Sequence, residues 1–359
     1  MTQPATAATT AYSPRHLIRL AIATFKVTIG LVFYGCTRRT PAFAYQSMIR
    51  LFVLTGGRSN DLLSRLIGII RRPYRLQGAR GVLGALREDQ LQRLVDRLRV
   101  RGYHKFDVKL PSELCDKLLN FALTQPCTPR ARDSDQQPTC AQPVVYDRKN
   151  PGAIVYDFSP GDLINYVDIQ RLMGDESIIA LAQEYLGSKP VLDTVNMWWM
   201  TAYTNQPDSN AAQLYHFDMD HARWIKFFVY LTDVTPESGP HCFVAGSHRR
   251  DGIPGHLLQK GYTRLSDAEV RATFPPSDVL EITGPRGTIL AVDTRGLHKG
   301  KSLLQGERLI FEMEFSNSLF GAFLPGRGEL TDLHEPAFSR FVKQHRRIYQ
   351  RWIGPSTPL

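Results

Sequence analysis

The chain has 359 residues, of which 43% are hydrophobic and 22% charged; this argues against general disorder and suffices for one large domain with an appendage or for two modest domains. Its five cysteines have no Cys-x-x-Cys spacing, which argues against a disulfide framework or a cysteine zinc site and for a cytoplasmic protein. Residues 1–101 hold 17 Lys and Arg against 4 Asp and Glu, a net charge of +13, whereas the rest holds 27 against 30. The N-terminal part is therefore expected to meet an anionic partner.

Two amphipathic helices are predicted near the N-terminus. Residues 17–34 are apolar except for Arg19 and Lys26, which fall with Arg15 on one side of a helix. Residues 61–75 repeat this pattern of apolar residues with arginines on one face. Charges inside an apolar run are unlike a signal peptide and costly in a transmembrane span, so we expect helices that lie in a membrane surface.

The predicted membrane contact is peripheral, runs through residues 14–75, and would place the protein at the inner face of the membrane. The alternative is that both helices pack on the following domain and keep their arginines in solvent. No nucleic acid partner is expected, because no binding motif or interleaved aromatic and basic stripe is present.

From about residue 84 the pattern changes to a mixture of helices and short strands. Helices are predicted where apolar residues recur at helical spacing, and strands where β-branched and aromatic residues gather. The predicted helices are 87–101, 111–123, 175–186, 266–272 and 336–352. The predicted strands are 103–108, 190–203, 213–218, 224–231, 308–315 and two within 278–293.

This order of elements predicts an α+β fold with a double-sheet β-barrel or jelly-roll core. We place a helical region at 1–83, the main domain at 84–325 and a helical C-terminal extension packed on it at 326–359. The polar segment 127–142 and the insertion 252–276 are predicted to be surface loops that shape the substrate pocket.

One set of residues indicates metal chemistry. His216 and Asp218 are two residues apart in a predicted strand, so both side chains leave the same face. His298 follows about eighty residues later, and Arg308 begins another strand. Two histidines and one carboxylate leave positions open on a metal and suit non-haem Fe(II), while a buried arginine suits a carboxylate.

These residues, with KFFVYLTDV, SGPHCFVAGSHR and GTILAVDTRGL around them, make residues 84–321 resemble the phytanoyl-CoA dioxygenase family of Fe(II)- and 2-oxoglutarate-dependent enzymes. The resemblance implies a double-stranded β-helix with His216, Asp218 and His298 as iron ligands. It further implies Arg308 as the partner of the distal carboxylate of 2-oxoglutarate, with O2 as the second cosubstrate.

Several neighbouring residues have weaker claims to a role. Asn196 and Lys226 could contact the cosubstrate, although a structural role is the more ordinary reading of each. Trp198 and Trp199 point to opposite faces of a predicted strand, so at most one can line the pocket.

Rival metal ligands are close in sequence to the motif. Asp220 and His221 lie beside it, but the spacing of the family favours neither. His241 and His248 fall in turn contexts, where polar capping is the ordinary explanation.

The resemblance implies hydroxylation of an unactivated C–H bond in an acyl, lipid-linked or other small molecule, with succinate and CO2 as co-products. Desaturation and ring closure remain open, while an aspartate at position 218 speaks against a halogenase. One alternative is the same chemistry on a soluble natural-product or amino-acid-derived metabolite. The other is a non-catalytic jelly-roll binding module, whose signature would be the loss of a ligand residue.

Overall fold

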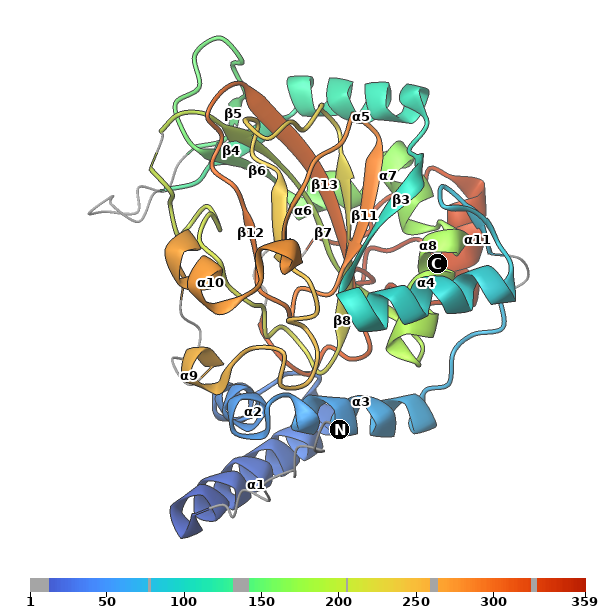
Figure 1. The fold of residues 1–359 in the computed structure, drawn as a ribbon. Coiled ribbons are helices and arrows are strands. Elements are labelled where there is room, and N and C mark those ends of the chain that lie inside the picture. Colours follow the sequence, from blue (N-terminus) through green and yellow to red (C-terminus); the bar gives the residue numbers. More distant parts are fainter. Residues whose placement is uncertain (1–12, 77–78, 132–141, 205, 259–263, 324–327) are drawn as a thin grey trace.

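Two antiparallel sheets form the centre of the molecule, with helices on the outer side of the larger sheet and three N-terminal helices in a layer beneath (Figure 1). This computed structural model describes residues 13–76, 79–131, 142–204, 206–258, 264–323 and 328–359. The architecture is the jelly roll, or double-stranded β-helix, that the sequence predicted.

The larger sheet has eight antiparallel strands in the order β3-β11-β8-β13-β7-β6-β4-β5. Its strands are β3 (Tyr103–Lys109), β4 (Pro126–Pro129), β5 (Val144–Val145), β6 (Val155–Phe158), β7 (Val191–Thr201), β8 (Trp224–Tyr230), β11 (Thr288–Val292) and β13 (Glu307–Ser316). Successive side chains of β7 and β13 alternate between the helices on one face and the smaller sheet on the other. Trp199 and Phe311, for example, belong to the core beneath the helices.

The smaller sheet has three strands in the order β10-β9-β12. These are β9 (His241–Val244), β10 (Val279–Ile282) and β12 (His298–Gly300). A separate hairpin, β1 (Ala79–Gly81) with β2 (Gly84–Leu86), leads into the main domain. The strand predicted at 213–218 is wrong: Tyr215 and His216 form only isolated bridges, to Leu265 and His298, because each pairs with a different segment.

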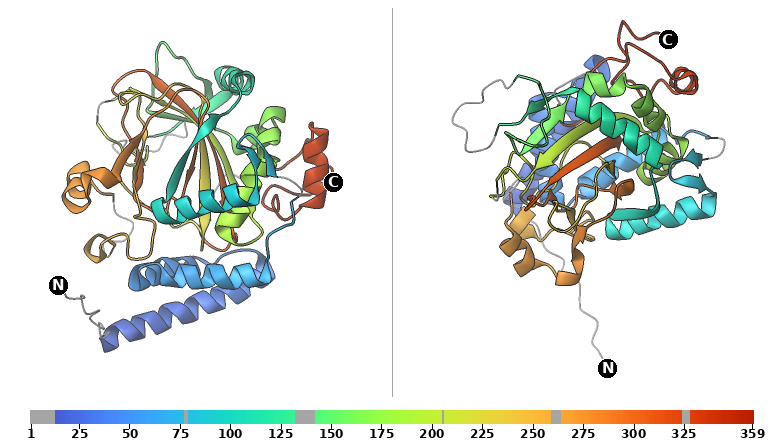
Figure 2. Two further views of the ribbon diagram at one scale, coloured as in Figure 1. Left: turned by 45° about the vertical axis from the view of Figure 1, so that its right-hand side comes forward. Right: turned by 90° about the horizontal axis from the view of Figure 1, so that it is seen from above.

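Helices cover the outer face of the larger sheet (Figure 2). They are α4 (Glu88–Arg101), α5 (Ser112–Thr124), α6 (Pro160–Ile164), α7 (Val167–Met173), α8 (Glu176–Leu186) and α11 (Pro336–Gln344). Local signals set their ends: Asp175 caps α8 by accepting from the backbone N–H of Ile178, and Gly102 and Gly187 close α4 and α8 in the left-handed region.

The helix predicted at 336–352 is too long, because α11 ends at Gln344 and turns follow. The carbonyl of Ile348 accepts a hydrogen bond from Leu192 N at 2.7 Å, and Trp352 Nε1 donates to Leu192 O at 2.9 Å. Contacts with β7 thus replace helical hydrogen bonds in this segment and hold the C-terminal extension on the domain.

The insertion after β9 contains α9 (Gly255–Leu258), α10 (Asp267–Thr273) and a short 3-10 helix, Pro276–Asp278. The predicted helix at 266–272 is confirmed as α10, which begins with a capping box between Ser266 and Glu269. Residues 259–263 of the insertion and 132–141 of the predicted loop at 127–142 lie outside the described residues, and the start of that loop is β4.

Three helices form the N-terminal layer: α1 (Pro14–Thr37), α2 (Ala42–Thr55) and α3 (Arg58–Ile70). The sequence predicted α1 but missed α2. It also placed the end of α3 too late, since the helix stops before Arg71 and Pro73 follows, which disfavours helical backbone at the residue before it.

Candidate active site

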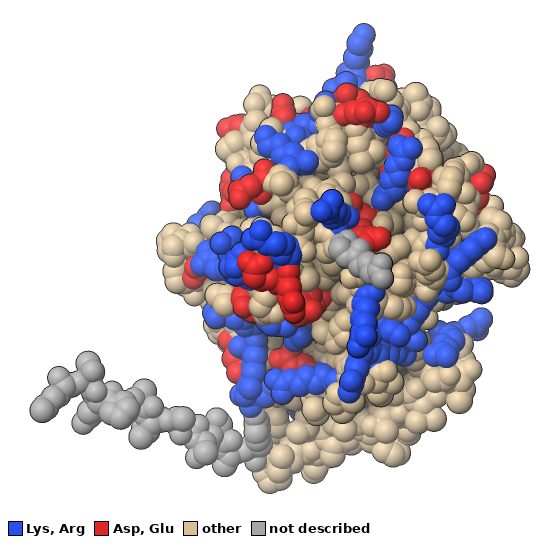
Figure 3. Space-filling model, turned by 90° about the vertical axis from the view of Figure 1, so that its right-hand side faces the viewer, with Lys and Arg blue, Asp and Glu red and all other residues tan. Residues whose placement is uncertain are grey.

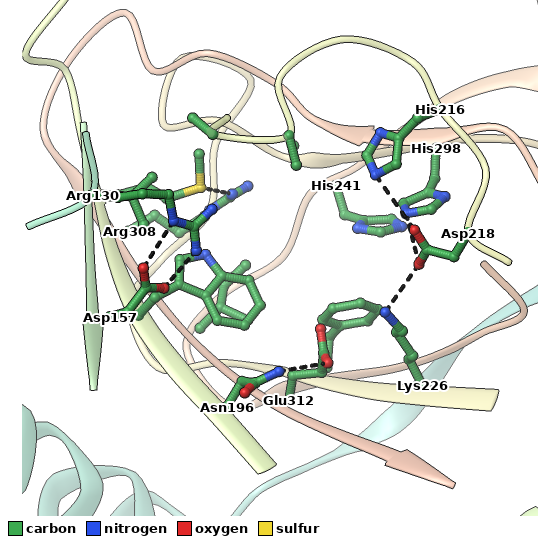
Figure 4. Close-up of a pocket in the computed structure, with 18 residues that line it drawn as sticks. Arg130, Asp157, Asn196, His216, Asp218, Lys226, His241, His298, Arg308 and Glu312 are labelled. Atoms are coloured by element: carbon green, nitrogen blue, oxygen red, sulfur yellow. Dashed lines mark hydrogen bonds and ion pairs between the residues drawn. The ribbon is translucent and has the colours of Figure 1, made fainter. Parts of the chain in front are cut away.

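A cavity of about 290 Å³ lies between the two sheets (Figure 4). Alternate residues of three neighbouring strands of the larger sheet face into it, as the period of a strand requires. They are Asn196, Trp198 and Met200 of β7, Lys226 and Phe228 of β8, and Arg308, Ile310 and Glu312 of β13. The smaller sheet contributes residues from β9 and β12 on the opposite side.

His216, Asp218 and His298 gather at one end of the cavity, with one possible ligand atom of each within 4.8 Å of the others. Asp218 Oδ1 is 3.7 Å from His216 Nε2, and Asp218 Oδ2 is 3.6 Å from His298 Nε2. The backbones of the two histidines are joined by a reciprocal pair of hydrogen bonds of 2.9 and 2.8 Å. The bridge between residues 216 and 298 therefore brings together candidate metal ligands that are far apart in sequence.

Both histidines are held in the tautomer that a metal requires. Nδ1 of His216 lies 2.9 Å from Leu214 O, and Nδ1 of His298 lies 3.0 Å from Gly296 O. Since a carbonyl oxygen can only accept, each Nδ1 carries the proton and each Nε2 presents its lone pair to the cavity. Burial lowers the pKa of both rings, that of His216 to about 3 with a further contribution from His298, so both are neutral at pH 7.

Lys226 stabilises the charged form of Asp218. Burial alone would raise the Asp218 pKa, but Lys226 and the two histidines hold it well below its usual range. Lys226 Nζ donates to Asp218 Oδ2 at 3.0 Å and lies 3.3 Å from Glu314 Oε2. The donor set is thus two neutral imidazoles and one ionised carboxylate, which fits Fe(II).

Arg308 is a buried cation in the same cavity, only 2% exposed. One Nη contacts the sulfur of Met200, while Nε and Nη1 have no hydrogen-bond acceptor among the described residues. Burial lowers the pKa of Arg308 to about 10, yet the guanidinium remains charged at pH 7. Buried donors without acceptors are costly, so this arrangement suits an anion from outside the chain.

Three cavity residues were not singled out from the sequence as functional. His241, read as a turn residue, lies at the start of β9 and stacks on His298 with ring centroids 5.7 Å apart. Its Nε2 is buried and has no hydrogen-bond partner among the described residues.

Arg130 and Asp157 form a two-point ion pair at the cavity wall, with Nε to Oδ2 at 2.8 Å and Nη2 to Oδ1 at 2.6 Å. The alternation of side chains along a strand could have indicated that Asp157 faces the cavity. No sequence pattern indicated that Arg130 does so.

Three further residues proposed from the sequence, Asn196, Lys226 and Trp198, line the cavity. Asn196 lines the cavity and donates to Glu312 Oε1 at 3.2 Å, and Lys226 lines it while bound to Asp218. Trp198 faces the cavity and Trp199 the core, as alternation predicted.

Asp220 and His221 do not line the cavity. His221 is fully buried and bound through Nε2 to Asp193, whose other oxygen accepts from Arg351 Nη1 at 2.6 Å. His248 contacts the carbonyl of Arg99 at 3.1 Å. These groups are engaged in the scaffold around the site.

The ligand segment is supported from behind by α2. Tyr215, Phe217 and Met219 point into an apolar cluster that includes Phe52 of α2, while the residues between them face the cavity. The rings of Phe52 and Phe217 stack with centroids 5.8 Å apart. The N-terminal layer is therefore part of the wall that positions His216 and Asp218.

A jelly roll that carries two histidines and a carboxylate at one end of its cavity has the architecture of the Fe(II)- and 2-oxoglutarate-dependent oxygenases. The family model for phytanoyl-CoA dioxygenase matches residues 84–301, and the chain belongs to this family. Its cofactors are Fe(II) and 2-oxoglutarate, with O2 as co-substrate. No curated protein sequence matches the chain significantly.

Three of the solved structures to which the chain is similar are SnoN, HygX and EctD. The epimerase SnoN, in complex with Fe3+, alpha ketoglutarate and nogalamycin RO, is 19% identical, with a TM-score of 0.42 over 64% of this chain and 84% of that one. HygX from Streptomyces hygroscopicus, with nickel and 2-oxoglutarate bound, is 16% identical, with a TM-score of 0.46 over 69% and 92%. EctD from S. alaskensis, in its apoform, is 17% identical, with a TM-score of 0.46 over 71% and 88%.

Proposed function

We propose that the protein is an Fe(II)- and 2-oxoglutarate-dependent hydroxylase that acts on an unactivated C–H bond of an acyl, lipid-linked or other small molecule. The main support for this proposal is that the candidate metal ligands and the buried guanidinium of Arg308 lie in one cavity. Three possible ligand atoms lie within 4.8 Å of one another, and a buried guanidinium with unpaired N–H groups shares the same 290 Å³.

In this proposal His216 Nε2, His298 Nε2 and the Asp218 carboxylate hold the iron, and Arg308 binds the distal carboxylate of 2-oxoglutarate. When bound, iron and 2-oxoglutarate supply oxidative decarboxylation with O2, which yields succinate and CO2 and provides one oxygen atom for the substrate.

The chain's own contribution is orientation and exclusion of water. Lys226 fixes the Asp218 carboxylate, and the carbonyls of Leu214 and Gly296 fix the imidazole planes. Trp198 and Phe228 give the cavity apolar walls on the side of the larger sheet, which limits water near the reacting carbon. The half-exposed pair Arg130 and Asp157 lies where the cavity meets solvent and would meet the substrate first.

The test is succinate release by anaerobically purified protein after addition of Fe(II), 2-oxoglutarate and O2. We expect slow release without substrate, lost in His216→Ala and in Arg308→Ala but kept in His334→Ala, a half-exposed histidine that does not line the cavity. Binding of neither iron nor 2-oxoglutarate by the wild type would contradict the proposal and favour a binding module.

Substrates are then screened by the stimulation of succinate release, with acyl and lipid-linked compounds compared with soluble amino-acid and natural-product compounds. A product that gains one oxygen atom supports hydroxylation. A product that loses two hydrogens, closes a ring or only inverts a stereocentre would assign the site a different outcome of the same oxidative chemistry.

A further inference from the structure

The N-terminal layer exposes more large apolar side chains than any other described part of the chain. Six of the seven on α1 recur at helical spacing and, at about 100° per residue, fall within about 100° of arc on one side of the helix, with Leu17 outside that arc. This apolar stripe consists of Ile18, Ile22, Phe25, Ile29, Val32 and Phe33. Phe25 and Val32 are each 66% exposed. Patches of this kind mark a surface that binds a partner.

The opposite side of α1 is fixed to α2. Its buried residues are Ala23, Val27, Gly30 and Tyr34. A Cβ on Gly30 would lie 2.2 Å from the Cβ of Ala44, so the two backbones approach as closely as a glycine allows. By length and composition α1 could cross a membrane, but it lies flat along the layer, which a spanning helix cannot do without leaving α2 (Figure 2).

The third helix of the layer continues the apolar surface. Leu62, Leu66, Ile69 and Ile70 of α3 are exposed, Ile70 by 80%. A groove of about 360 Å³ lies between α1, α2 and α3, and seven of its twelve lining residues are apolar, among them Leu20 and Leu63. Leu62 and Leu66 line this groove as well, so the exposed apolar face of α3 continues into it.

Cations without counter-ions border this surface. Arg19, Lys26 and Arg50 line a groove of about 550 Å³ between α1 and α2, and none of them forms an ion pair with another described residue. Figure 3 shows a row of Lys and Arg side chains above a base that carries almost no charge. The only acidic residue among the first 87 is Asp61, and it is paired with Arg223 at 2.8 Å.

We propose that the layer formed by α1, α2 and α3 docks in the plane of an anionic phospholipid bilayer. The apolar stripe and the exposed face of α3 enter the boundary between headgroups and acyl chains, and Arg19, Lys26 and Arg50 remain at the level of the phosphates. A second copy of the chain fits this surface poorly, because its cations would face the same cations.

Docking of this layer would also orient the oxygenase domain. Asn60 Nδ2 of α3 donates to the carbonyls of His221 and Ala222 at 3.3 Å, and Phe52 of α2 stacks on Phe217 beside the metal-ligand residues. The layer is thus joined to the domain by buried contacts rather than by a free linker. The proposal does not depend on the catalytic activity, and its test measures lipid binding alone.

The test is co-sedimentation of the full chain with vesicles of phosphatidylcholine, with and without phosphatidylglycerol. We expect binding that requires phosphatidylglycerol and weakens with salt. Phe25→Glu with Val32→Glu should lower the partition coefficient by about tenfold or more. Val100→Glu with Leu304→Glu, two comparably exposed apolar residues outside the layer, should leave it unchanged.

Charge is tested by Arg19→Gln with Lys26→Gln, which should lower binding to anionic vesicles by about fivefold for each cation. Far-ultraviolet circular dichroism and the thermal unfolding midpoint should be the same in every variant, which shows that each is folded. The proposal is overturned if the wild type does not bind anionic vesicles or if both glutamate pairs weaken binding equally. Resistance to alkaline extraction would instead make α1 a membrane span, and a dimer that buries Phe25 would make a second copy the partner.

Discussion

Arg295 and Arg308 are both almost completely buried, yet their electrostatic surroundings are opposite. Arg295 follows β11 and donates from Nε to Asp293 Oδ1 at 3.0 Å, and the same carboxylate accepts from the hydroxyl of Tyr185. Arg308, on β13, has no carboxylate within ion-pair distance among the described residues. Burial would lower both pKa values, but Asp293 raises that of Arg295 while that of Arg308 falls to about 10.

The difference separates a structural cation from a binding cation. A buried guanidinium that has its own carboxylate is fully satisfied within the chain. One without a carboxylate lowers stability until an anion reaches it, and a fold retains such a group where the anion is a ligand. Under the proposed function, Arg295 in the turn after β11 stabilises the fold and Arg308 on β13 binds the cosubstrate, and three substitutions test this distinction.

The largest effect is expected for Arg295→Met. Removal of the cation leaves the buried Asp293 carboxylate with two hydrogen-bond donors among the described residues, the Tyr185 hydroxyl and the backbone N–H of residue 295. A buried pair broken in this way costs about 3–5 kcal/mol in the free energy of unfolding. Chemical denaturation measures the loss. A variant as stable as the wild type would show that Asp293 and Arg295 are not the pair described here.

Lys226→Met removes a cation that is paired like Arg295 but lies beside the proposed metal ligands. Without a metal, Asp218, Asp220 and Glu314 lose their shared counter-charge, and we expect the free energy of unfolding to fall by about 3 kcal/mol. Fe(II) or Co(II) should then stabilise the variant more than the wild type, because the metal becomes the only cation next to Asp218. Equal stabilisation of both by metal would contradict this reading.

Arg308→Met is expected to separate stability from binding. Loss of an unpaired buried charge should raise the free energy of unfolding by about 1–3 kcal/mol. The dissociation constant of 2-oxoglutarate should rise by about 100-fold, the equivalent of two charge-assisted hydrogen bonds. Calorimetry with Arg148→Met, an exposed arginine, as control checks both values. A variant that is less stable than the wild type but binds 2-oxoglutarate normally would make Arg308 structural.

The sequence predicted most helices from the helical spacing of apolar residues and most strands from their β-branched and aromatic residues. The strands predicted at 190–203, 224–231 and 308–315 are β7, β8 and β13, and the helix predicted at 175–186 is α8. His216, Asp218, His298 and Arg308, named from the motif and its resemblance to a family, lie around one cavity. The motif and the family resemblance thus predicted residues of the cavity that are far apart in sequence, which the pattern within a single helix or strand cannot do.

The features that the sequence did not predict depend on contacts between distant segments. α2 was missed because its sequence is apolar on nearly every side, as its burial between α1 and the domain requires. The Arg130–Asp157 pair and the unpartnered Nε2 of His241 arise from the packing of strands that are not adjacent in sequence. The path of residues 215–218 is set by two separate bridges rather than by strand propensity.

The smallest effect is expected for Asn196, the remaining cosubstrate candidate. Its Nδ2 already donates to Glu312 Oε1 at 3.2 Å, an acceptor it shares with Thr194 Oγ1, whereas the Arg308 donors have no such partner. Asn196→Ala should therefore cost about 1 kcal/mol in stability and change the dissociation constant of 2-oxoglutarate by no more than about twofold. Asn196→Asp should cost more, because two carboxylates would then face each other across the β7–β13 pair. If Asn196→Ala instead weakens 2-oxoglutarate binding as much as Arg308→Met while stability is unchanged, the amide binds the cosubstrate, and an acceptor within the chain does not mark a residue as structural.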